Sequence, residues 1–321
     1  MTKGKSQITE FINDITHRLP NIIVKLDEPI KDYTTFKIGG SVSVMIFPDS
    51  MDCLADICGI LSEHEIIPLV IGNGSNILAD DNHLDLVAVN TSMLNGISAL
   101  GYNWDAEDSA SPEYYDIEVE AGALLLDIAV FACDKGLTGL EFAHGIPGTV
   151  GGAVVMNAGA YGGEMKDVVY STTAYNFSTG KYILTATDNE FSYRKSRFSD
   201  IEDIIFSAVI RLEKGDKNTI KNTMDELYAR RRESQPLEFP SGGSTFKRPQ
   251  EDCYAASLIE QAGLRGFEIG DAQVSKKHTG FIINKGNATF ADVIAVIENV
   301  QNTVFKRSGI RLIPEIKIIR G

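Results

Sequence analysis

Two glycine-rich segments contain the residues best suited to chemistry. The longer spans residues 145–163, where seven of nineteen residues are glycine, and the shorter, 72–76, reads Gly-Asn-Gly-Ser-Asn after the apolar run 68–71. Glycine lets main-chain N–H groups approach a ligand without an intervening Cβ atom. Successive exposed N–H groups form a concavity that binds anions. Each segment alone is equally typical of a tight turn, but the pair favours a large phosphate-bearing cofactor held by the backbone.

Other familiar catalytic patterns are missing. No complete G-x-G-x-x-G follows a strand at 72–77, which disfavours a Rossmann fold. The serine at 244 lies in Gly-Gly-Ser-Thr-Phe, which does not match the G-x-S-x-G of hydrolases. The four cysteines contain no CxxC pair and no zinc-ligand spacing, so we expect no metal site and buried thiols in a reducing compartment.

The overall composition narrows the possible partners. The 321 residues are 43% apolar and have a formal net charge of −14, which argues against a nucleic-acid partner. Several basic residues recur in the last third of the chain and would suit an anionic small molecule, although solvated lysines are the usual explanation. There is no signal-peptide pattern and no run of about 18 apolar residues. We therefore expect a cytoplasmic protein without membrane contact.

Hydrophobic periodicity places these segments among mixed helices and strands. The patterns predict helices over 5–18, 51–64, 124–135, 217–232, 255–262 and 290–308. They predict strands over 42–47, 68–71, 117–120, 168–176, 181–185, 203–212, 280–284 and 311–319. The acidic segment 101–116 is predicted to be a surface hairpin or loop, and a domain boundary is expected near 214–220.

Eight segments in a fixed order resemble one enzyme family. They are residues 33–40, 70–78, 139–163, 193–198, 241–249, 258–266, 274–278 and 312–316. Together they resemble the UDP-N-acetylenolpyruvoylglucosamine reductases, also called UDP-N-acetylmuramate dehydrogenases, of bacterial peptidoglycan synthesis. The resemblance covers residues 33–321.

The resemblance implies an α+β fold. It implies a two-lobed domain of the vanillyl-alcohol-oxidase type over 31–215, which binds FAD non-covalently, and a smaller C-terminal α+β substrate domain over 216–321. Residues 1–30 form an N-terminal helical extension. The chain looks like the shorter subtype of the family, since 270–278 contains no tyrosine-bearing insertion.

The resemblance also implies a reaction in two halves. NADPH gives a hydride to FAD, and the reduced flavin gives a hydride to the β-carbon of UDP-N-acetylglucosamine enolpyruvate, forming UDP-N-acetylmuramate. Arg194 would polarise the substrate carboxylate, and Ser244 would donate a proton to the α-carbon. Glu315 would stabilise the enol, and burial beside Pro314 would raise its pKa. Taken singly, Arg194 is more typical of a structural surface arginine, Ser244 of a turn serine, and Glu315 of a solvent-facing strand glutamate.

Ligand contacts follow from the same motifs. The pyrophosphate of FAD is assigned to Gly72, Asn73, Gly74, Ser75 and Asn76. The isoalloxazine and ribityl are assigned to Gly145, Ile146, Gly148, Thr149, Gly151, Gly152 and Ala153, and Asn157, Gly159 and Ala160 would orient the ring or the substrate. Lys247, Gln273, Lys276 and His278 are candidates for the UDP phosphates and sugar. Covalent flavin attachment through His144 is disfavoured.

Two further hypotheses remain open. The first is an oxidase of the same flavin fold that acts on an alcohol or sugar with O₂. The second is a flavin- or nucleotide-binding regulator without turnover. The presence of Arg194, Ser244 and Glu315 favours the reductase over both. The expected partners are small molecules, with NADPH and substrate taking turns in one cleft, and the expected assembly is a monomer or weak oligomer.

Overall fold

The chain folds into two compact units that interleave along the sequence. The computed structural model describes residues 2–103, 114–250 and 253–321, the side chains of residues 2–6 and 103 excepted. The first unit comprises residues 1–25, 45–73 and 87–230, and the second comprises 26–44, 74–86 and 231–321. The sequence predicts three contiguous parts, 1–30, 31–215 and 216–321, whereas each of these two units combines separate stretches of the chain. The predicted division therefore stays a prediction.

The first unit contains the glycine-rich segment 145–163. Its helices are α1 (Thr2–Arg18), α2 (Met51–Glu63), α3 (Leu125–Asp134), α4 (Val150–Met156) and most of α5 (Lys217–Ser234). Its strands are β3 (Leu69–Ile71), β6 (Ile97–Asn103), β7 (Tyr114–Glu120), β8 (Leu137–Thr138), β9 (Gly159–Ala160), β10 (Gly163–Glu164), β11 (Val169–Asn176), β12 (Gly180–Thr185) and β13 (Ile204–Lys214). The chain passes between the units within β1 (Ile23–Pro29), β2 (Ser41–Phe47), β5 (Leu84–Asn90) and α5, and between residues 73 and 74.

A six-stranded sheet forms the base of the first unit. Its order is β12-β11-β13-β7-β6, with β8 paired to β13, and every described pairing is antiparallel. Alternate side chains of β7 and β13, among them Ile117, Val119 and Ile210, enter the core together with α3 and α4. The predicted hairpin at 101–116 is confirmed in its two arms, β6 and β7, while its tip, 104–113, lies outside the described residues.

A buried ion pair joins two neighbouring strands of this sheet. Arg211 donates two hydrogen bonds of 2.8 Å each to Asp116, which is 2% exposed. The guanidinium also lies 3.5 Å from the ring centroid of Tyr170. Bidentate pairing and stacking satisfy a charge that would otherwise be costly to bury.

Removing the carboxylate should therefore destabilise the fold. We expect Asp116→Ala to lower the free energy of unfolding by about 2–3 kcal/mol, because it leaves the partly buried Arg211 uncompensated. The exposed pair Lys221–Asp225 provides the control, and Lys221→Ala should leave the free energy of unfolding nearly unchanged, because solvent screens the pair. Urea titration measures both values, and equal effects would contradict a structural role for the Asp116 pair.

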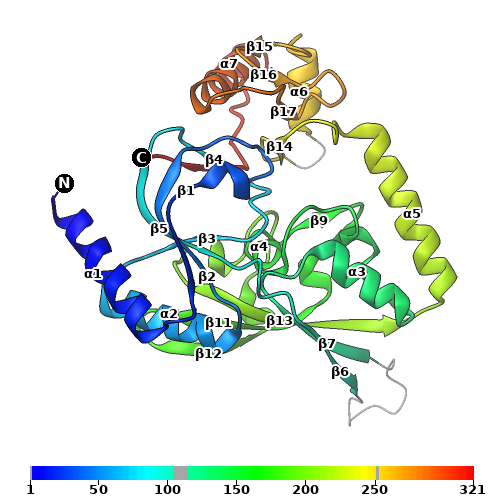
Figure 1. The fold of residues 1–321 in the computed structure, drawn as a ribbon. Helices are drawn as coiled ribbons and strands as arrows, with labels where there is room; N and C mark the ends of the chain where they lie inside the picture. The colour runs from blue at the N-terminus through cyan, green and yellow to red at the C-terminus, as the bar shows by residue number, and fades with distance from the viewer. Residues whose placement is uncertain (1, 104–113, 251–252) are drawn as a thin grey trace. The chain divides into compact units, whose positions relative to one another are not determined.

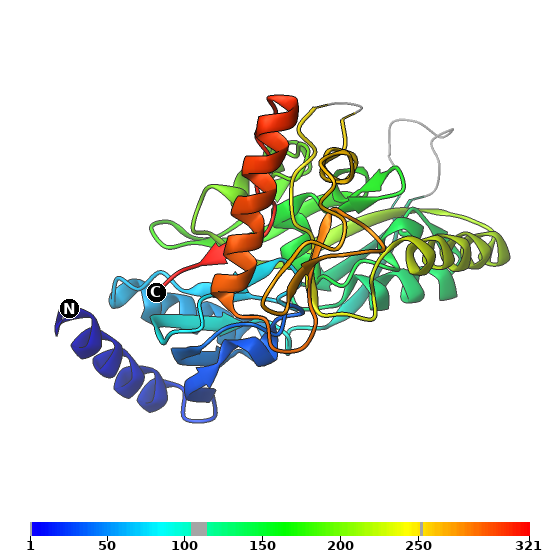
Figure 2. The same cartoon turned by 90° about the horizontal axis from the view of Figure 1, so that it is seen from above.

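The second unit contains β4 (Ile77–Ala79), β14 (Ser241–Ser244), α6 (Ala255–Gln261), β15 (Glu268–Ile269), β16 (Ala272–Val274), β17 (Phe281–Asn284), α7 (Phe290–Ser308) and β18 (Lys317–Ile319). A small sheet has the order β14-β17-β16-β15. Figures 1 and 2 show α7 lying against this sheet, and the apolar face of α7 enters the core of the second unit through Val293, Val296 and Val300. Thr289 caps α7 by accepting the Asp292 N–H, which is the expected start signal of a helix.

Most predicted elements are confirmed, and one strand was predicted too long. All six predicted helices form with ends within a few residues. The strand predicted over 311–319 is limited to Lys317–Ile319, which pairs in parallel with β4. Pro314 has no N–H to donate to a strand ladder, and its segment makes a single bridge, to Phe246.

Candidate active site

Within the first unit, Gly72 and Asn73 of the shorter glycine-rich segment contact the longer one. The Asn73 side-chain amide donates a hydrogen bond of 2.8 Å to the Pro147 carbonyl. Gly72 faces Thr149 so closely that a Cβ atom at position 72 would lie 2.1 Å from the threonine Oγ1. Only glycine fits there, so Gly72 and Asn73 line one site with residues 147–149.

The main chain at this site offers hydrogen-bond donors. Among residues 2–103, 114–250 and 253–321, no group accepts from the N–H groups of Gly72, Asn73, Gly148, Thr149 and Gly152, which all belong to the first unit. Main-chain N–H groups in folded proteins are nearly always paired with protein or solvent. A set of unpaired donors on glycine-rich backbone therefore fits an anionic ligand.

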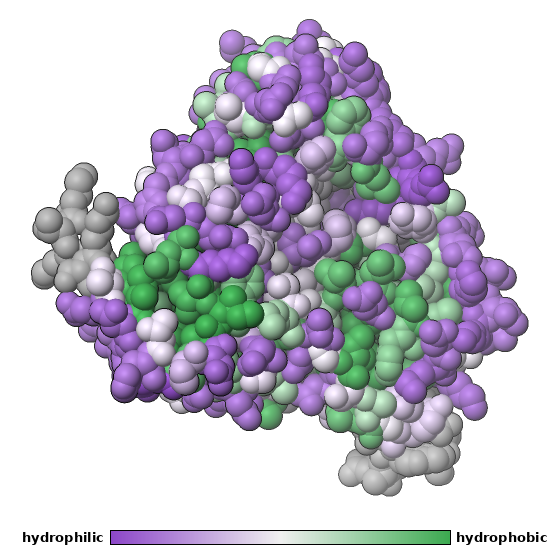
Figure 3. All heavy atoms as spheres, viewed as in Figure 1, coloured by the Kyte–Doolittle hydropathy of each residue, from purple (hydrophilic) through white to green (hydrophobic). Residues whose placement is uncertain are grey.

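Buried packing holds the longer glycine-rich segment, 145–163, in place. Leu125 donates to the Gly148 carbonyl and Gly151 donates to the Ala121 carbonyl, at 3.0 and 2.8 Å. On α3, Leu125 and Ile128 are fully buried, whereas Leu126 and Val130 are 42% and 43% exposed. Figure 3 shows hydrophobic side chains gathered on the surface over α3. The buried face of this helix anchors the glycine segment to the core.

Asn157 ends α4 in a left-handed conformation. Its φ is +41°, and it is fully buried. Its side chain donates to Glu164 at 2.6 Å and to the Ser192 carbonyl at 3.0 Å, and accepts from the Lys166 N–H at 2.9 Å. These bonds use most of the capacity of the amide. Asn157 thus joins the glycine segment to the turn that contains Arg194.

Arg194 lies at the tip of that turn. Its φ is +53°, and Ser192 and Lys195 bridge the turn on either side. The guanidinium donates to the Gly159 carbonyl at 3.0 Å and lies 5.3 Å from the ring centroid of Tyr193. Ala160 pairs with Gly163 in the adjoining β9–β10 hairpin. The first unit therefore places Arg194 beside Gly159.

Gly74 belongs to the second unit and packs against the segment 33–40. Its φ is +57°, and a Cβ atom there would lie 2.0 Å from the Tyr33 carbonyl oxygen. Thr35 donates to the Gly74 carbonyl at 3.3 Å. The Asn76 side chain donates to the Glu315 carbonyl at 3.2 Å. Residues 74–76 thus lie against the segment that contains a predicted catalytic glutamate.

Ser244 and Glu315 lie on adjoining segments of the second unit. Ser244 ends β14 and is exposed, and Glu315 is half-buried. Glu315 donates its N–H to the Thr245 carbonyl at 2.8 Å, and Phe246 bridges to Pro314. Gly243, with a φ of +77°, allows the irregular pairing that precedes the serine. Two residues far apart in sequence are thereby brought together.

The four predicted substrate residues have different surroundings. Lys247 donates its N–H to the Ile313 carbonyl at 2.9 Å, and the stem of Lys276 lies over Gly266. Gln273 is buried on β16, and its amide donates to Glu268. The second unit therefore uses the Gln273 side chain in an internal bond, whereas Lys276 remains exposed.

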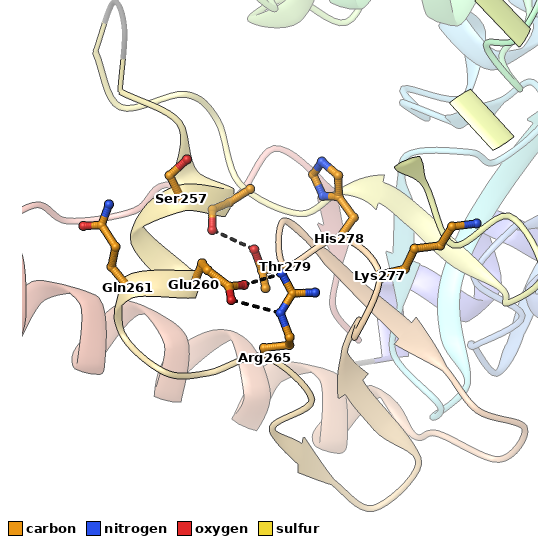
Figure 4. Close-up of a pocket in the computed structure, with 8 residues that line it drawn as sticks. Ser257, Glu260, Gln261, Arg265, Lys277, His278 and Thr279 are labelled. Atoms are coloured by element: carbon orange, nitrogen blue, oxygen red, sulfur yellow. Dashed lines mark hydrogen bonds and ion pairs between the residues drawn. The ribbon is translucent and has the colours of Figure 1, made fainter. Parts of the chain in front are cut away.

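His278 lines a pocket of about 400 Å³ in the second unit. Figure 4 shows Arg265 and Lys277 beside it, two residues not included among the predicted site residues. Arg265 pairs with Glu260 at 2.7 Å, and the Lys277 ammonium donates to the Arg232 carbonyl at 2.6 Å. The recurrence of basic residues in this stretch was the only sequence signal for either. Burial, with a smaller contribution from Arg265, lowers the pKa of His278.

The remaining reactive side chains lie in other settings. His144 Nδ1 is buried with no hydrogen-bond partner within the described part of the chain, and the ring lies 5.6 Å from that of Tyr228. The four cysteines are free thiols, and burial raises the pKa of Cys58 to about 12.

The described residues contain no cluster of three or more His, Cys, Asp or Glu side chains suited to a metal ion. None of the described helices combines the length and apolar character needed to span a bilayer.

Comparison with known proteins assigns this arrangement to a family. Residues 235–319 match the profile of the UDP-N-acetylenolpyruvoylglucosamine reductase C-terminal domain, and residues 42–186 match that of an FAD-binding domain. A UDP-N-acetylenolpyruvoylglucosamine reductase of Caldanaerobacter subterraneus subsp. tengcongensis is 47% identical over 92% of this chain and 93% of its own length. The chain belongs to the UDP-N-acetylenolpyruvoylglucosamine reductase family. The resemblance seen in the sequence is thereby confirmed.

Other members of the reductase family agree with this assignment. The enzyme of Agathobacter rectalis is 44% identical over 96% of this chain and 98% of its own length. The crystal structure of the Thermus caldophilus reductase superposes with a TM-score of 0.74 at 29% identity, covering 93% of this chain and 99% of that one. The predicted α+β fold with an FAD-binding domain and a reductase C-terminal domain is confirmed.

The residues present fit FAD. A pyrophosphate needs donors and close backbone approach, and Gly72 is packed too tightly for any side chain. Unpaired N–H groups at Asn73, Gly148 and Thr149 supply the donors within the first unit. The chain is thus an FAD-dependent oxidoreductase of this family.

Proposed function

We propose that this chain reduces UDP-N-acetylglucosamine enolpyruvate to UDP-N-acetylmuramate with NADPH as the hydride donor, in peptidoglycan synthesis. The main support is a hydrogen bond between the segments that contain Ser244 and Glu315. The Glu315 N–H donates to the carbonyl of Thr245, the residue after Ser244, within the region that matches the reductase C-terminal profile. An oxidase that removes a hydride from an alcohol does not need a proton donor of this kind. The site therefore favours the reductase over the oxidase.

FAD, when bound, supplies hydride transfer between NADPH and the β-carbon of the enolpyruvyl group. The α-carbon then gains negative charge shared with the carboxylate, and it needs a proton to complete the two-electron reduction of the double bond. Ser244 Oγ is assigned to that proton, since its side chain is exposed at the end of β14. Solvent would afterwards reprotonate the serine.

Arg194 and Glu315 are assigned to the charge that develops on the substrate. Arg194 would hold the carboxylate through its planar fork, with the bond to Gly159 fixing one nitrogen. Glu315 would stabilise the enol as Ser244 delivers its proton. Because Arg194 belongs to the first unit and the other two residues to the second, their joint action on one substrate is itself part of the proposal.

The ligand contacts are proposed on the same basis. Residues 72–76 are assigned to the pyrophosphate, residues 145–153 to the isoalloxazine and ribityl, and Gly159 and Ala160 to orientation of the ring. Asn157 is assigned a positioning role, since its amide is used within the unit. Lys247 and Lys276 are retained for the UDP-sugar, and Gln273 would have to leave Glu268 to join them. His278 is assigned instead to a positioning role.

Cellular roles belong to the proposal as well. UDP-N-acetylmuramate is a cell-wall precursor, so activity would be tied to cell shape and division. The free thiols are consistent with the reducing cytoplasm, where the nucleotide substrates are made.

Anaerobic spectroscopy tests the proposed function. The purified yellow protein should be bleached by NADPH and should regain its colour when UDP-N-acetylglucosamine enolpyruvate is added. Bleaching without recovery on substrate, but with recovery on O₂, would instead favour an oxidase. Failure to bleach, or absence of bound flavin, would favour a regulator without turnover.

A Glu315 variant separates the two half-reactions. We expect Glu315→Gln to leave flavin reduction by NADPH within about twofold, and to slow reduction of the enolpyruvyl substrate by about 100-fold, because the carboxylate acts only where charge develops. Stopped-flow absorbance of the flavin measures both steps. Near-normal reoxidation by substrate would remove Glu315 from the mechanism.

A further inference from the structure

His278 lies between the pocket and the strand that contains Ser244. We propose that His278 is a positioning residue for Ser244, acting through the main chain of Gly280. This inference rests on the proposed function of Ser244 and goes beyond it, since it assigns His278 to geometry and not to the UDP-sugar.

Two hydrogen bonds connect the His278 ring, through the Gly280 main chain, to the main chain of Thr245, the residue after Ser244. The Gly280 N–H donates to His278 Nδ1 at 3.2 Å. The Gly280 carbonyl accepts the N–H of Thr245, the residue after Ser244, at 2.8 Å. On the next residue, Phe281 is the strand partner of Ser244. The orientation of the Gly280 backbone therefore sets the position of the end of β14.

The imidazole packs against the turn and the strand that follow it. The ring meets Phe281 edge-on, with centroids 5.0 Å apart. A Cβ atom on Gly280 would lie 3.0 Å from the ring Cε1 and 3.3 Å from the Cβ of Ala256. Thr279 holds the same turn to α6 by donating to the Ala256 carbonyl at 2.7 Å. The half-buried ring thus packs against Phe281 of β17 and the Gly280 backbone, in a turn that Thr279 ties to α6.

Burial disfavours a charged imidazole at this position, and the neighbouring charges do not offset it. Glu260 of α6, Arg265 of the following turn, and Lys277 on its own segment line the pocket with it. Glu260 is paired with Arg265, so it does not compensate a charged imidazole. Thr245 and Phe281, on β14 and β17, are uncharged. Burial first, and then Arg265, lowers the pKa of His278.

Protonation would break this arrangement. A neutral imidazole with its proton on Nε2 accepts from Gly280 at Nδ1, but an imidazolium has donors on both nitrogens. Below the lowered pKa, Gly280 would lose its acceptor and the end of β14 would shift. The second half-reaction should therefore fall on the acid side of a pKa below the usual value of about 6.5, with the first half-reaction much less affected.

Two substitutions at position 278 test separately the hydrogen-bond acceptor, the charge and the ring of the side chain. Asparagine can accept an N–H from two residues ahead, as in an Asx turn, but does not titrate. Phenylalanine keeps a ring but has no acceptor. We expect His278→Phe to slow enolpyruvyl reduction about tenfold, the range of one lost hydrogen bond. His278→Asn should recover most of that loss and should lack the acid limb attributed to His278.

The experiment uses the full-length FAD-loaded protein in stopped flow from pH 5 to 8, with both half-reactions followed separately. His17→Asn, an exposed histidine on α1, is the matched control and should keep the wild-type profile. In Gly280→Ala the new methyl group would crowd the His278 ring. The double variant Gly280→Ala/His278→Ala would remove that contact. The single variant Gly280→Ala should slow reduction of the enolpyruvyl substrate, as His278→Phe does.

The outcomes are distinct. If His278→Phe raises KM for the substrate with kcat unchanged, or if His278→Asn is as slow as His278→Phe, His278 contacts the substrate or packs structurally and the positioning role is overturned. An acid limb retained in His278→Asn also overturns it. If the wild-type flavin is not reoxidised by the enolpyruvyl substrate at all, the proposed function fails, independently of His278.

Discussion

Ser244→Ala should retain flavin reduction by NADPH and lose most reduction of the enolpyruvyl substrate. General acid catalysis typically contributes about 10²–10⁴-fold, and we expect a loss in that range in the second half-reaction alone. The hydroxyl is needed only when the α-carbon takes its proton. Rapid mixing of NADPH-reduced protein with UDP-N-acetylglucosamine enolpyruvate measures this step directly.

The strand itself provides the control for this prediction. Ser241 begins β14, and its backbone, not its hydroxyl, bonds with Thr35. Ser241→Ala should therefore behave as wild type in both half-reactions. Equal loss of both half-reactions in Ser244→Ala would point to a general defect of folding or binding and would sink the proton-donor role.

Gly72→Ala should weaken FAD binding by about 10–100-fold. The new methyl group would lie 2.1 Å from Thr149 Oγ1, and Thr149 is buried, so the two glycine-rich segments must separate. Overpacking of this kind costs about 1–3 kcal/mol. Fluorescence quenching on titration of the apoprotein with FAD gives the dissociation constant.

A second substitution tests whether the contact with Thr149 is the cause. Thr149→Ala removes Oγ1 and Cγ2 and leaves only Cβ, 3.1 Å from the new methyl group. The double variant Gly72→Ala/Thr149→Ala should therefore bind FAD more tightly than Gly72→Ala alone. Gly59→Ala, which meets nothing within 4 Å, should bind normally. Weak binding in the double variant equal to that of Gly72→Ala would refute the proposed clash.

The sequence indicated the two glycine-rich segments but not the constraints on single side chains. Glycine at position 72 was predicted from backbone approach to a ligand, and the structure adds a second reason, the packing of Thr149. Asn157 and Arg194 adopt positive φ although neither is glycine. Their conformations depend on hydrogen bonds with Ser192 and Gly159, far along the chain, which local propensity does not encode.

Polar residues of the second unit illustrate the same limit. Gln273 and Lys277 both lie in a basic, polar stretch typical of an anion site. Their side chains are instead bonded to Glu268 and to the Arg232 carbonyl. A sequence reveals which groups can form hydrogen bonds, whereas the partner of each depends on the fold.

By itself, the sequence determined the elements and the chemistry available to them. Apolar periodicity fixed the helices and most strands, since burial of one face is a local pattern, and the ordered motifs determined the family. Tertiary structure alone decided which segments meet. Asn73 reaches Pro147 across 74 residues, and Asn76 reaches Glu315 across 239. Such contacts follow from the packing and register of whole elements, because residues distant in sequence are brought together only when their elements bury a common core.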